Sequence, residues 1–172
     1  MSHFDKQLAI GRYYERVASQ WLQESRGSKI LPVYDYTGSD GEKAPNLRSL
    51  VESESLVVPD LLVCTDGKTS WVEIKYKTHA IEFRLAKELR TGLSLRLWND
   101  YKAVQDASGL PVEIIFIHKK EGEIRGGLWD NLREFRQIDT SDTMCKGGMV
   151  FFPYLQIPLL ATLPKLSQAG AA

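Results

Sequence analysis

The sequence predicts a single α/β domain, in which a mixed β-sheet is flanked by helices. Two segments repeat their apolar residues with helical spacing, and between and after them lie short runs rich in β-branched and aromatic residues, bounded by turn residues. A length of 172 residues suits one domain. The composition, 43% hydrophobic and 26% charged, is that of a folded protein. No apolar run approaches the roughly 18 residues that a membrane span requires.

The first element is a helix over residues 3–25. Leu8, Ala18 and Leu22 recur at spacings that place them on one helical face. Glu15 falls within this register, so it lies at or beside the face that packs inward. A carboxylate is rarely buried without a partner.

A strand over residues 29–36 follows the helix, because aromatic and β-branched side chains alternate there. Residues 37–46 (TGSDGEKAPN) are dense in turn formers and predict a loop. Residues 47–55 are ambiguous, and a short helical turn is one interpretation.

Two clear strands come next, over residues 56–65 and 70–77. Between them stands Asp66-Gly67, the strongest short-range signal for a two-residue hairpin turn. The two strands are therefore expected to pair antiparallel.

The basic segment 78–92 fits no regular pattern. Residues 94–107 predict a second helix, which ends before the breaker sequence SGLP. Residues 112–118 (VEIIFIH) predict a strand that is buried on both faces. Residues 124–128 and 148–152 predict late, peripheral strands, and the chain after residue 158 turns small and polar.

The hairpin turn brings two carboxylates together. If Asp66 and Gly67 are the two loop residues, Asp60 lies directly opposite Glu73, with Cβ atoms about 4.5–5.5 Å apart. Because side chains alternate along a strand, Lys75 lies on the same face. One face of the hairpin therefore presents two acids and a lysine.

These residue types suit metal-assisted hydrolysis of a phosphodiester. Facing carboxylates destabilise one another unless positive charge lies between them. Mg²⁺ is commonly held by one or two carboxylates, with water and substrate phosphate completing its shell. The backbone carbonyl of Ile74 can supply a further oxygen, and Lys75 can orient water or stabilise charge on the phosphate. The alternative is an ordinary half-exposed strand, for which alternating Glu and Lys are also typical.

The Pro59-Asp60 dipeptide, followed on the next strand by Glu73-Ile74-Lys75, resembles the signature of the PD-(D/E)XK nuclease superfamily, whose members have the restriction-endonuclease-like fold. The order of elements over residues 3–118 (αβββαβ) is similar to the core of that fold. The resemblance implies one nuclease-like domain over residues 1–158 and a partly disordered tail over residues 159–172. Holliday-junction resolvases share this compact plan.

The resemblance also implies roles for individual residues. Asp60 and Glu73 would hold Mg²⁺ or Mn²⁺ together with the Ile74 carbonyl, and Lys75 would be the catalytic lysine. Glu15 would be an accessory acid that reaches the metal through water. The alternative for Glu15 is a carboxylate at the margin of the apolar stripe, paired with a neighbour on its own helix.

The basic residues after the hairpin are candidates for DNA binding. Residues 75–102 carry seven lysines and arginines against three acids, although the whole chain has a formal net charge of zero. Lys77, Arg84, Lys87 and Arg90 are the candidate phosphate contacts. A solvated surface is the alternative.

The sequence therefore predicts a cytoplasmic, Mg²⁺-dependent endodeoxyribonuclease acting in DNA repair, recombination or restriction, with no membrane partner. We expect a homodimer, because cutting both strands with one site per chain requires two copies. One alternative is a nuclease-fold protein that binds nucleic acid without cutting it, and another is a protein-interaction domain. Two cysteines make neither a disulfide framework nor a zinc site, and His118, at the end of a buried strand, is expected to be structural.

Overall fold

The computed structural model describes residues 3–33, 46–48, 55–83, 87–128, 131–132, 136–138 and 148–163. The elements are α1 (His3–Arg26), β1 (Lys29–Pro32), β2 (Asn46–Arg48), β3 (Ser55–Val57), β4 (Leu61–Thr65), β5 (Lys68–Lys77), β6 (Ile81–Phe83), β7 (Glu88–Ser94), α2 (Leu95–Ser108), β8 (Val112–His118), β9 (Glu123–Leu128), β10 (Arg136–Ile138), β11 (Met149–Pro153), the 3₁₀ turn η3 (Tyr154–Gln156) and β12 (Leu159–Thr162). No helix among these residues is both long and apolar enough to cross a membrane.

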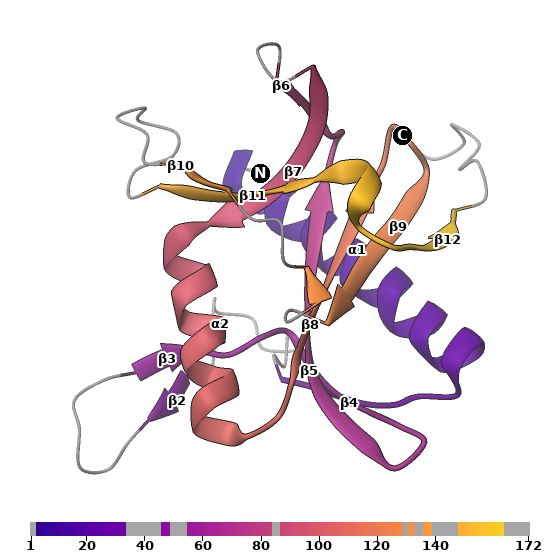
Figure 1. Cartoon of the computed structure of the whole chain (residues 1–172). Coiled ribbons are helices and arrows are strands. Elements are labelled where there is room, and N and C mark those ends of the chain that lie inside the picture. Colours follow the sequence, from indigo (N-terminus) through magenta and orange to yellow (C-terminus); the bar gives the residue numbers. More distant parts are fainter. Residues whose placement is uncertain are drawn as a thin grey trace.

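A six-stranded mixed sheet forms the centre of the fold, in the order β1-β4-β5-β8-β9-β12. The β5–β8 pair is parallel, and the other pairs of this sheet are antiparallel. A smaller sheet has the order β10-β11-β7-β6, and β2 pairs with β3. The predicted α/β architecture, a mixed sheet flanked by helices, is confirmed (Figure 1).

The two helices lie against opposite faces of the central sheet. Tyr14, Ala18 and Leu22 of α1 pack on one face in a cluster that includes Val72 and Ile74 of β5. On the other face, Trp98 and Tyr101 of α2 pack against residues of β8 and the smaller sheet. Every residue of β8 is buried, as expected for a strand covered on both sides.

Polar contacts fix the ends of both helices. Arg26, in the last turn of α1, donates to both carboxylate oxygens of Glu113 on β8 at 3.0 Å. The Ser94 side chain caps the N-terminus of α2, and Gly109 ends that helix in the left-handed conformation at φ 67°. The predicted helices are thus confirmed, to within a residue or two at their ends.

The segment predicted as one strand over residues 56–65 is two strands. Residues 55–57 form β3, residues 61–65 form β4, and the ladder breaks at Val58-Pro59-Asp60. Proline has no N–H to donate to a ladder, which explains the break. The short helical turn considered for residues 47–55 is wrong for residues 47, 48 and 55. These residues belong to β2 and β3, which pair with each other antiparallel.

The predicted strand over residues 29–36 is confirmed for residues 29–32, and residues 34–36 lie outside the described part of the chain. So does the predicted loop over residues 37–46, except that Asn46 belongs to β2.

The later strands are more central than their sequence indicated. The unclassified segment 78–92 contains β6 and most of β7, and β7 pairs with β11 inside the smaller sheet. The supposedly peripheral strand over residues 124–128 is β9, which lies between β8 and β12. Residues 159–162, assigned to the tail, form β12, which pairs with β9.

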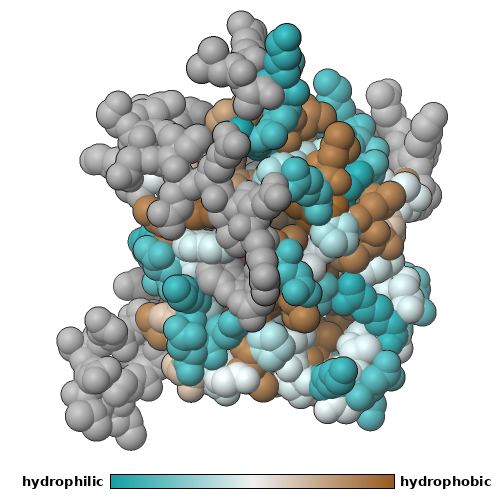
Figure 2. Space-filling view, in the orientation of Figure 1, coloured by the Kyte–Doolittle hydropathy of each residue, from teal (hydrophilic) through white to brown (hydrophobic). Residues whose placement is uncertain are grey.

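The surface mixes polar and apolar side chains on the face shown in Figure 2. Apolar side chains gather on the right of that view, over the region of β9, η3 and β12 (Figures 1 and 2). The exposed leucines of these elements are Leu128, Leu155 and Leu159.

Gly92 allows β7 and β11 of the smaller sheet to approach each other closely. A Cβ built on Gly92 would lie 2.2 Å from the Val150 carbonyl oxygen, whereas a Cβ on Gly11 of α1 would meet nothing closer than Glu15 Oε1 at 4.0 Å. We expect Gly92→Ala to lower the free energy of unfolding by about 1–3 kcal/mol. Gly11→Ala, the matched control, should raise it by about 0.5–1 kcal/mol, because alanine favours helix. Urea denaturation of both variants measures this, and equal stabilities would contradict the close approach.

Candidate active site

The β4–β5 hairpin has the register that the sequence predicted. Thr65 pairs with Lys68 and Leu61 pairs with Val72. The turn residues Asp66 and Gly67 both have positive φ, at 50° and 75°. This is the combination that a type I′ turn requires. Asp60, one residue before β4, therefore lies level with Glu73, although it is not itself part of the ladder.

Asp60 is held from two sides, at the point where the ladder between β4 and β5 stops. Its backbone carbonyl accepts a hydrogen bond from the Val33 N–H at 3.0 Å. Its carboxylate oxygen Oδ2 accepts one from the Ile74 N–H at 2.8 Å. The N–H and C=O of one strand residue point to the same side, so the Ile74 carbonyl also faces Asp60.

Glu73 is buried, and one of its two carboxylate oxygens forms an ion pair. The residue is 1% exposed. Its Oε1 forms an ion pair with Nζ of Lys75, whose side chain is 25% exposed. Its Oε2 is buried without a hydrogen-bond partner. A buried carboxylate oxygen normally has a partner, so this one is available to a ligand.

Charge and burial act strongly on these groups. Burial of the Asp60 carboxyl group, and then the negative charge of Glu73, raise the pKa of Asp60 well above its usual range. Burial by itself lowers the pKa of Lys75, but the charges of Glu73 and Asp60 outweigh it, so the pKa of Lys75 is raised overall. Lys75 is therefore a cation at neutral pH, and the two carboxylates share one positive partner.

Glu15 of α1 contributes to the same electrostatic environment. Its charge raises the pKa of both Asp60 and Lys75. Gly11, one turn earlier, has no side chain to cover the Glu15 carboxylate. The structure thus brings Glu15 from the first helix to the acids of the hairpin.

The donor set fits a hard divalent cation. Mg²⁺ needs only one or two protein carboxylates, and the Glu73 Oε2 atom and the Asp60 carboxyl group supply them. Positive charge placed between them would relieve the repulsion that raises the pKa of Asp60. Within the described ranges, no three His, Cys, Asp or Glu side chains already form a ligand set. Water and substrate oxygens would therefore complete the coordination.

The three candidate phosphate contacts that the structure describes belong to β5, to the turn between β6 and β7, and to β7. Lys77 is half-buried at the end of β5, and Lys87 is exposed in the turn between β6 and β7. Arg90 is 4% exposed and paired with Glu88. Its guanidinium lies 4.4 Å from the centre of the Phe83 ring. Arg90 thus has its partners within the protein, and Arg84 lies outside the described residues.

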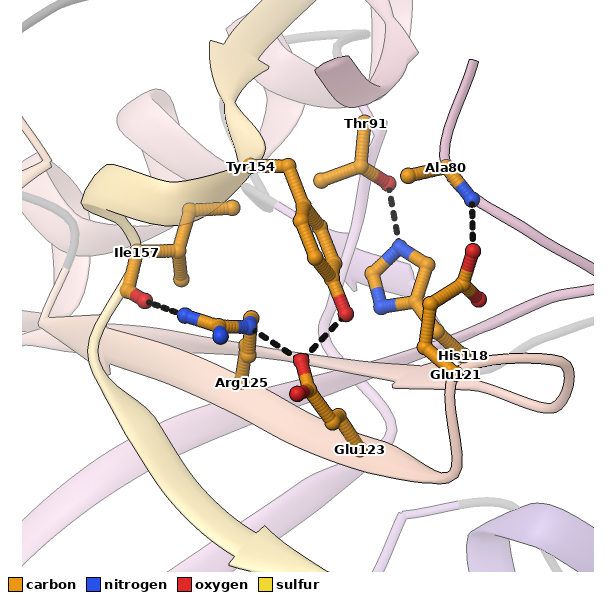
Figure 3. Close-up of polar contacts among 8 residues, drawn as sticks. All are labelled: Ala80, Thr91, His118, Glu121, Glu123, Arg125, Tyr154 and Ile157. Carbon is orange, nitrogen blue, oxygen red and sulfur yellow. Dashed lines mark hydrogen bonds and ion pairs between the residues drawn. The ribbon is translucent and has the colours of Figure 1, made fainter. Parts of the chain in front are cut away.

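His118 has the structural position expected from the sequence. It is fully buried, and its Nε2 lies 3.0 Å from the Thr91 hydroxyl of β7 (Figure 3). Burial lowers the pKa of His118 to about 4, so the ring is neutral at neutral pH.

Beside His118, a second group of polar residues ties β9 to the η3 region. Arg125 and Tyr154 both donate to Glu123, and Arg125 also donates to the Ile157 carbonyl at 2.8 Å (Figure 3). These contacts hold the η3 turn, which follows β11, against β9 of the central sheet.

A pocket near the site was not foreseen. Tyr13, Tyr14, Tyr76 and Lys119 line it, together with two apolar residues of α1. Adjacent tyrosines just before Glu15 and a tyrosine just after Lys75 are the sequence signal, but only the packing of α1 on β5 brings them together.

Comparison with known proteins shows the fold. No family model and no curated protein matches this sequence. Among solved structures, Hjc of Archaeoglobus fulgidus, a Holliday junction resolvase, is similar, with 14% identity, a TM-score of 0.51, and coverage of 85% of this chain and 91% of that one. D212, a nuclease from a fusselovirus, has 12% identity and a TM-score of 0.40, with coverage of 90% and 84%. The chain has the restriction-endonuclease-like fold.

The raised pKa of Asp60 predicts a pH-dependent penalty on stability. The folded state binds the Asp60 proton more tightly than the unfolded state, so stability falls as pH rises from about 3.9 through the raised folded pKa. In EDTA, Asp60→Asn should therefore melt at or above the wild-type temperature near neutral pH, and this gain should shrink towards pH 4. Each 1 kcal/mol of change in the free energy of unfolding shifts the melting temperature by about 2–4 °C.

Asp66→Asn makes the same chemical change at the exposed hairpin turn and is the matched control. Its melting-temperature difference from wild type should not follow pH in this way. An Asp60→Asn variant that is clearly less stable than wild type at pH 7 would show that the carboxylate stabilises the metal-free fold.

Proposed function

We propose that this protein is a metal-dependent nuclease that hydrolyses phosphodiester bonds of DNA. The observation that carries the proposal is the buried Glu73 oxygen without a partner, next to the coupled charges of Asp60 and Lys75. Mg²⁺ or Mn²⁺ is the cation that this oxygen donor set suits. The similar fold of Hjc, a Holliday junction resolvase, supports nucleic acid as the substrate.

The residues of the site would have two roles, binding of the cation and donation of a hydrogen bond to the reacting groups. Asp60, Glu73 and the Ile74 carbonyl would hold the cation, with Glu15 acting through water. When bound, the cation supplies Lewis-acid activation of water and neutralises charge on the phosphate. Lys75 stays protonated, because its pKa is raised, so it acts as a hydrogen-bond donor to the phosphate or the attacking water. The ion pair with Glu73 orients the ammonium group for this role.

Binding of the substrate would involve basic side chains outside the metal site. Lys77 and Lys87 remain candidates for phosphate contacts, as does Arg84, whereas Arg90 already has partners inside the protein. Cleavage of both strands would require a homodimer, because each chain carries one such site. Repair, recombination and restriction are the processes in which this activity would serve.

The test is cleavage of supercoiled plasmid and of branched DNA by the purified protein, with Mg²⁺, with Mn²⁺ and with EDTA. We expect cleavage only with metal. Asp60→Asn, Glu73→Gln and Lys75→Met should each lower the rate by about 10²–10⁴-fold, the scale for electrostatic and acid–base groups.

Lys68→Met is the matched control for Lys75→Met. Lys68 is exposed at the other end of β5, roughly 20 Å along the strand. Circular dichroism establishes that each variant is folded. Metal-independent cleavage, or unchanged cleavage by folded Asp60→Asn, would refute the proposed site. DNA binding without any cleavage by the wild type would identify a binding protein instead.

A further inference from the structure

Three tyrosines from two elements meet beside the candidate active site. The Tyr14 ring of α1 stacks on the Tyr76 ring of β5, with ring centres 4.3 Å apart and planes inclined by 14°. Tyr13 meets Tyr14 edge-on, with ring centres 5.1 Å apart. Tyr14 is 5% exposed but Tyr13 is 42% exposed. The stacked pair is therefore a fixed wall, and Tyr13 is an aromatic ring presented to solvent.

These rings line an open pocket of about 370 Å³, which Ala9, Ile10 and Lys119 complete. This volume is near the lower end of the range for small-ligand pockets, so it suits a single planar group better than a peptide segment. Burial, and then the neighbouring tyrosines, raise the pKa of Tyr14, so its hydroxyl group is uncharged at neutral pH. Lys119 is the one charged side chain among its described lining residues.

The pocket adjoins the candidate active site through α1, because Tyr14 precedes Glu15, whose charge acts on Asp60 and Lys75. On β5, Tyr76 follows Lys75 and points to the opposite face of the strand, the face on which α1 packs. The Lys119 N–H donates to the Lys77 carbonyl at 3.0 Å, which fixes the turn after β8 against the end of β5. Figure 1 shows α1 crossing behind the ends of these strands. The pocket therefore lies next to the candidate active site, on the α1 side of the sheet.

We infer that this pocket binds one unstacked nucleobase next to the cleavage position, with Lys119 contacting the adjoining phosphate. The inference rests on the proposed nuclease function and specifies its substrate class. Aromatic side chains and a lysine are the groups with which proteins hold single-stranded bases and their backbone. A base within a continuous duplex is stacked on its neighbours and cannot enter, so the preferred substrates are forked, gapped, branched or single-stranded.

The test compares binding of two DNA probes in EDTA, where no cleavage is expected. One probe is a continuous duplex, and the other is the same duplex opened into a fork, with the fluorescent base 2-aminopurine at its first unpaired positions. Tyr13→Leu removes the exposed ring but keeps an apolar side chain, and Tyr13→Phe keeps the ring. We expect Tyr13→Leu to weaken binding to the fork by about 5-fold or more, without changing duplex affinity.

The fluorescence of 2-aminopurine should be quenched by the wild type and by Tyr13→Phe, and recover with Tyr13→Leu. The slope of the logarithm of fork affinity against the logarithm of salt concentration should become shallower by about 0.7–0.9 in Lys119→Ala, because one phosphate contact is lost. Lys68→Ala, at the far end of β5, should leave that dependence unchanged. Circular dichroism checks the folding of each variant.

Equal effects of Tyr13→Leu on fork and duplex, or no effect on either, would overturn the base pocket. So would a change in oligomeric state caused by Tyr13→Leu, because the occupant would then be a second copy of the chain. These results leave metal-dependent cleavage by the wild type intact, and so differ from failure of the proposed function. A wild type that neither binds nor cuts DNA would overturn both.

Discussion

The hydrogen bond from the Ile74 N–H to the Asp60 carboxylate determines the geometry of the site. It lies where β4 has ended and β5 continues, so the side of β5 that faces Asp60 is no longer occupied by a neighbouring strand. The Val33 N–H holds the Asp60 backbone from the other side. The Asp60 carboxyl group is thereby fixed beside Glu73 and Lys75, whose charges act on it.

This arrangement carries an electrostatic cost that the rest of the fold offsets. Burial and a neighbouring carboxylate both disfavour ionised Asp60. The acids remain in place because β5 is a central strand, with α1 packed on one face and the cluster around α2 on the other. Strain of this kind in a well-packed sheet is typical of functional sites, because core residues far from the chemistry stabilise it.

The candidate site was predictable because it depends on local rules. A two-residue turn at Asp66-Gly67 fixes the pairing of the strands on either side, and alternation along β5 then places Glu73 and Lys75 on one face. The order of the main elements was also predictable, since proline and glycine act on their immediate neighbours. The break before β4 was missed, because the run of apolar residues on both sides of Pro59 was interpreted as one strand.

The rest depended on contacts between distant segments. β7 pairs with β11 through a close approach at Gly92 that nothing near residue 92 indicates. Arg90 can be buried because its guanidinium group forms an ion pair with Glu88 and lies over the Phe83 ring. The tyrosine pocket likewise exists because α1 packs on β5, which brings Tyr14 onto Tyr76. In each case the sequence of one segment does not show which distant segment packs against it.

The most direct test of this account is titration of Mn²⁺ into the metal-free protein, with free Mn²⁺ measured by electron paramagnetic resonance. The account predicts saturable binding by the wild type and by Asp66→Asn, and loss of that binding in both Asp60→Asn and Glu73→Gln. Binding that survives in both of these folded variants, or a wild type that binds no Mn²⁺ at millimolar concentration, would contradict the claim that these two carboxylates form a metal site.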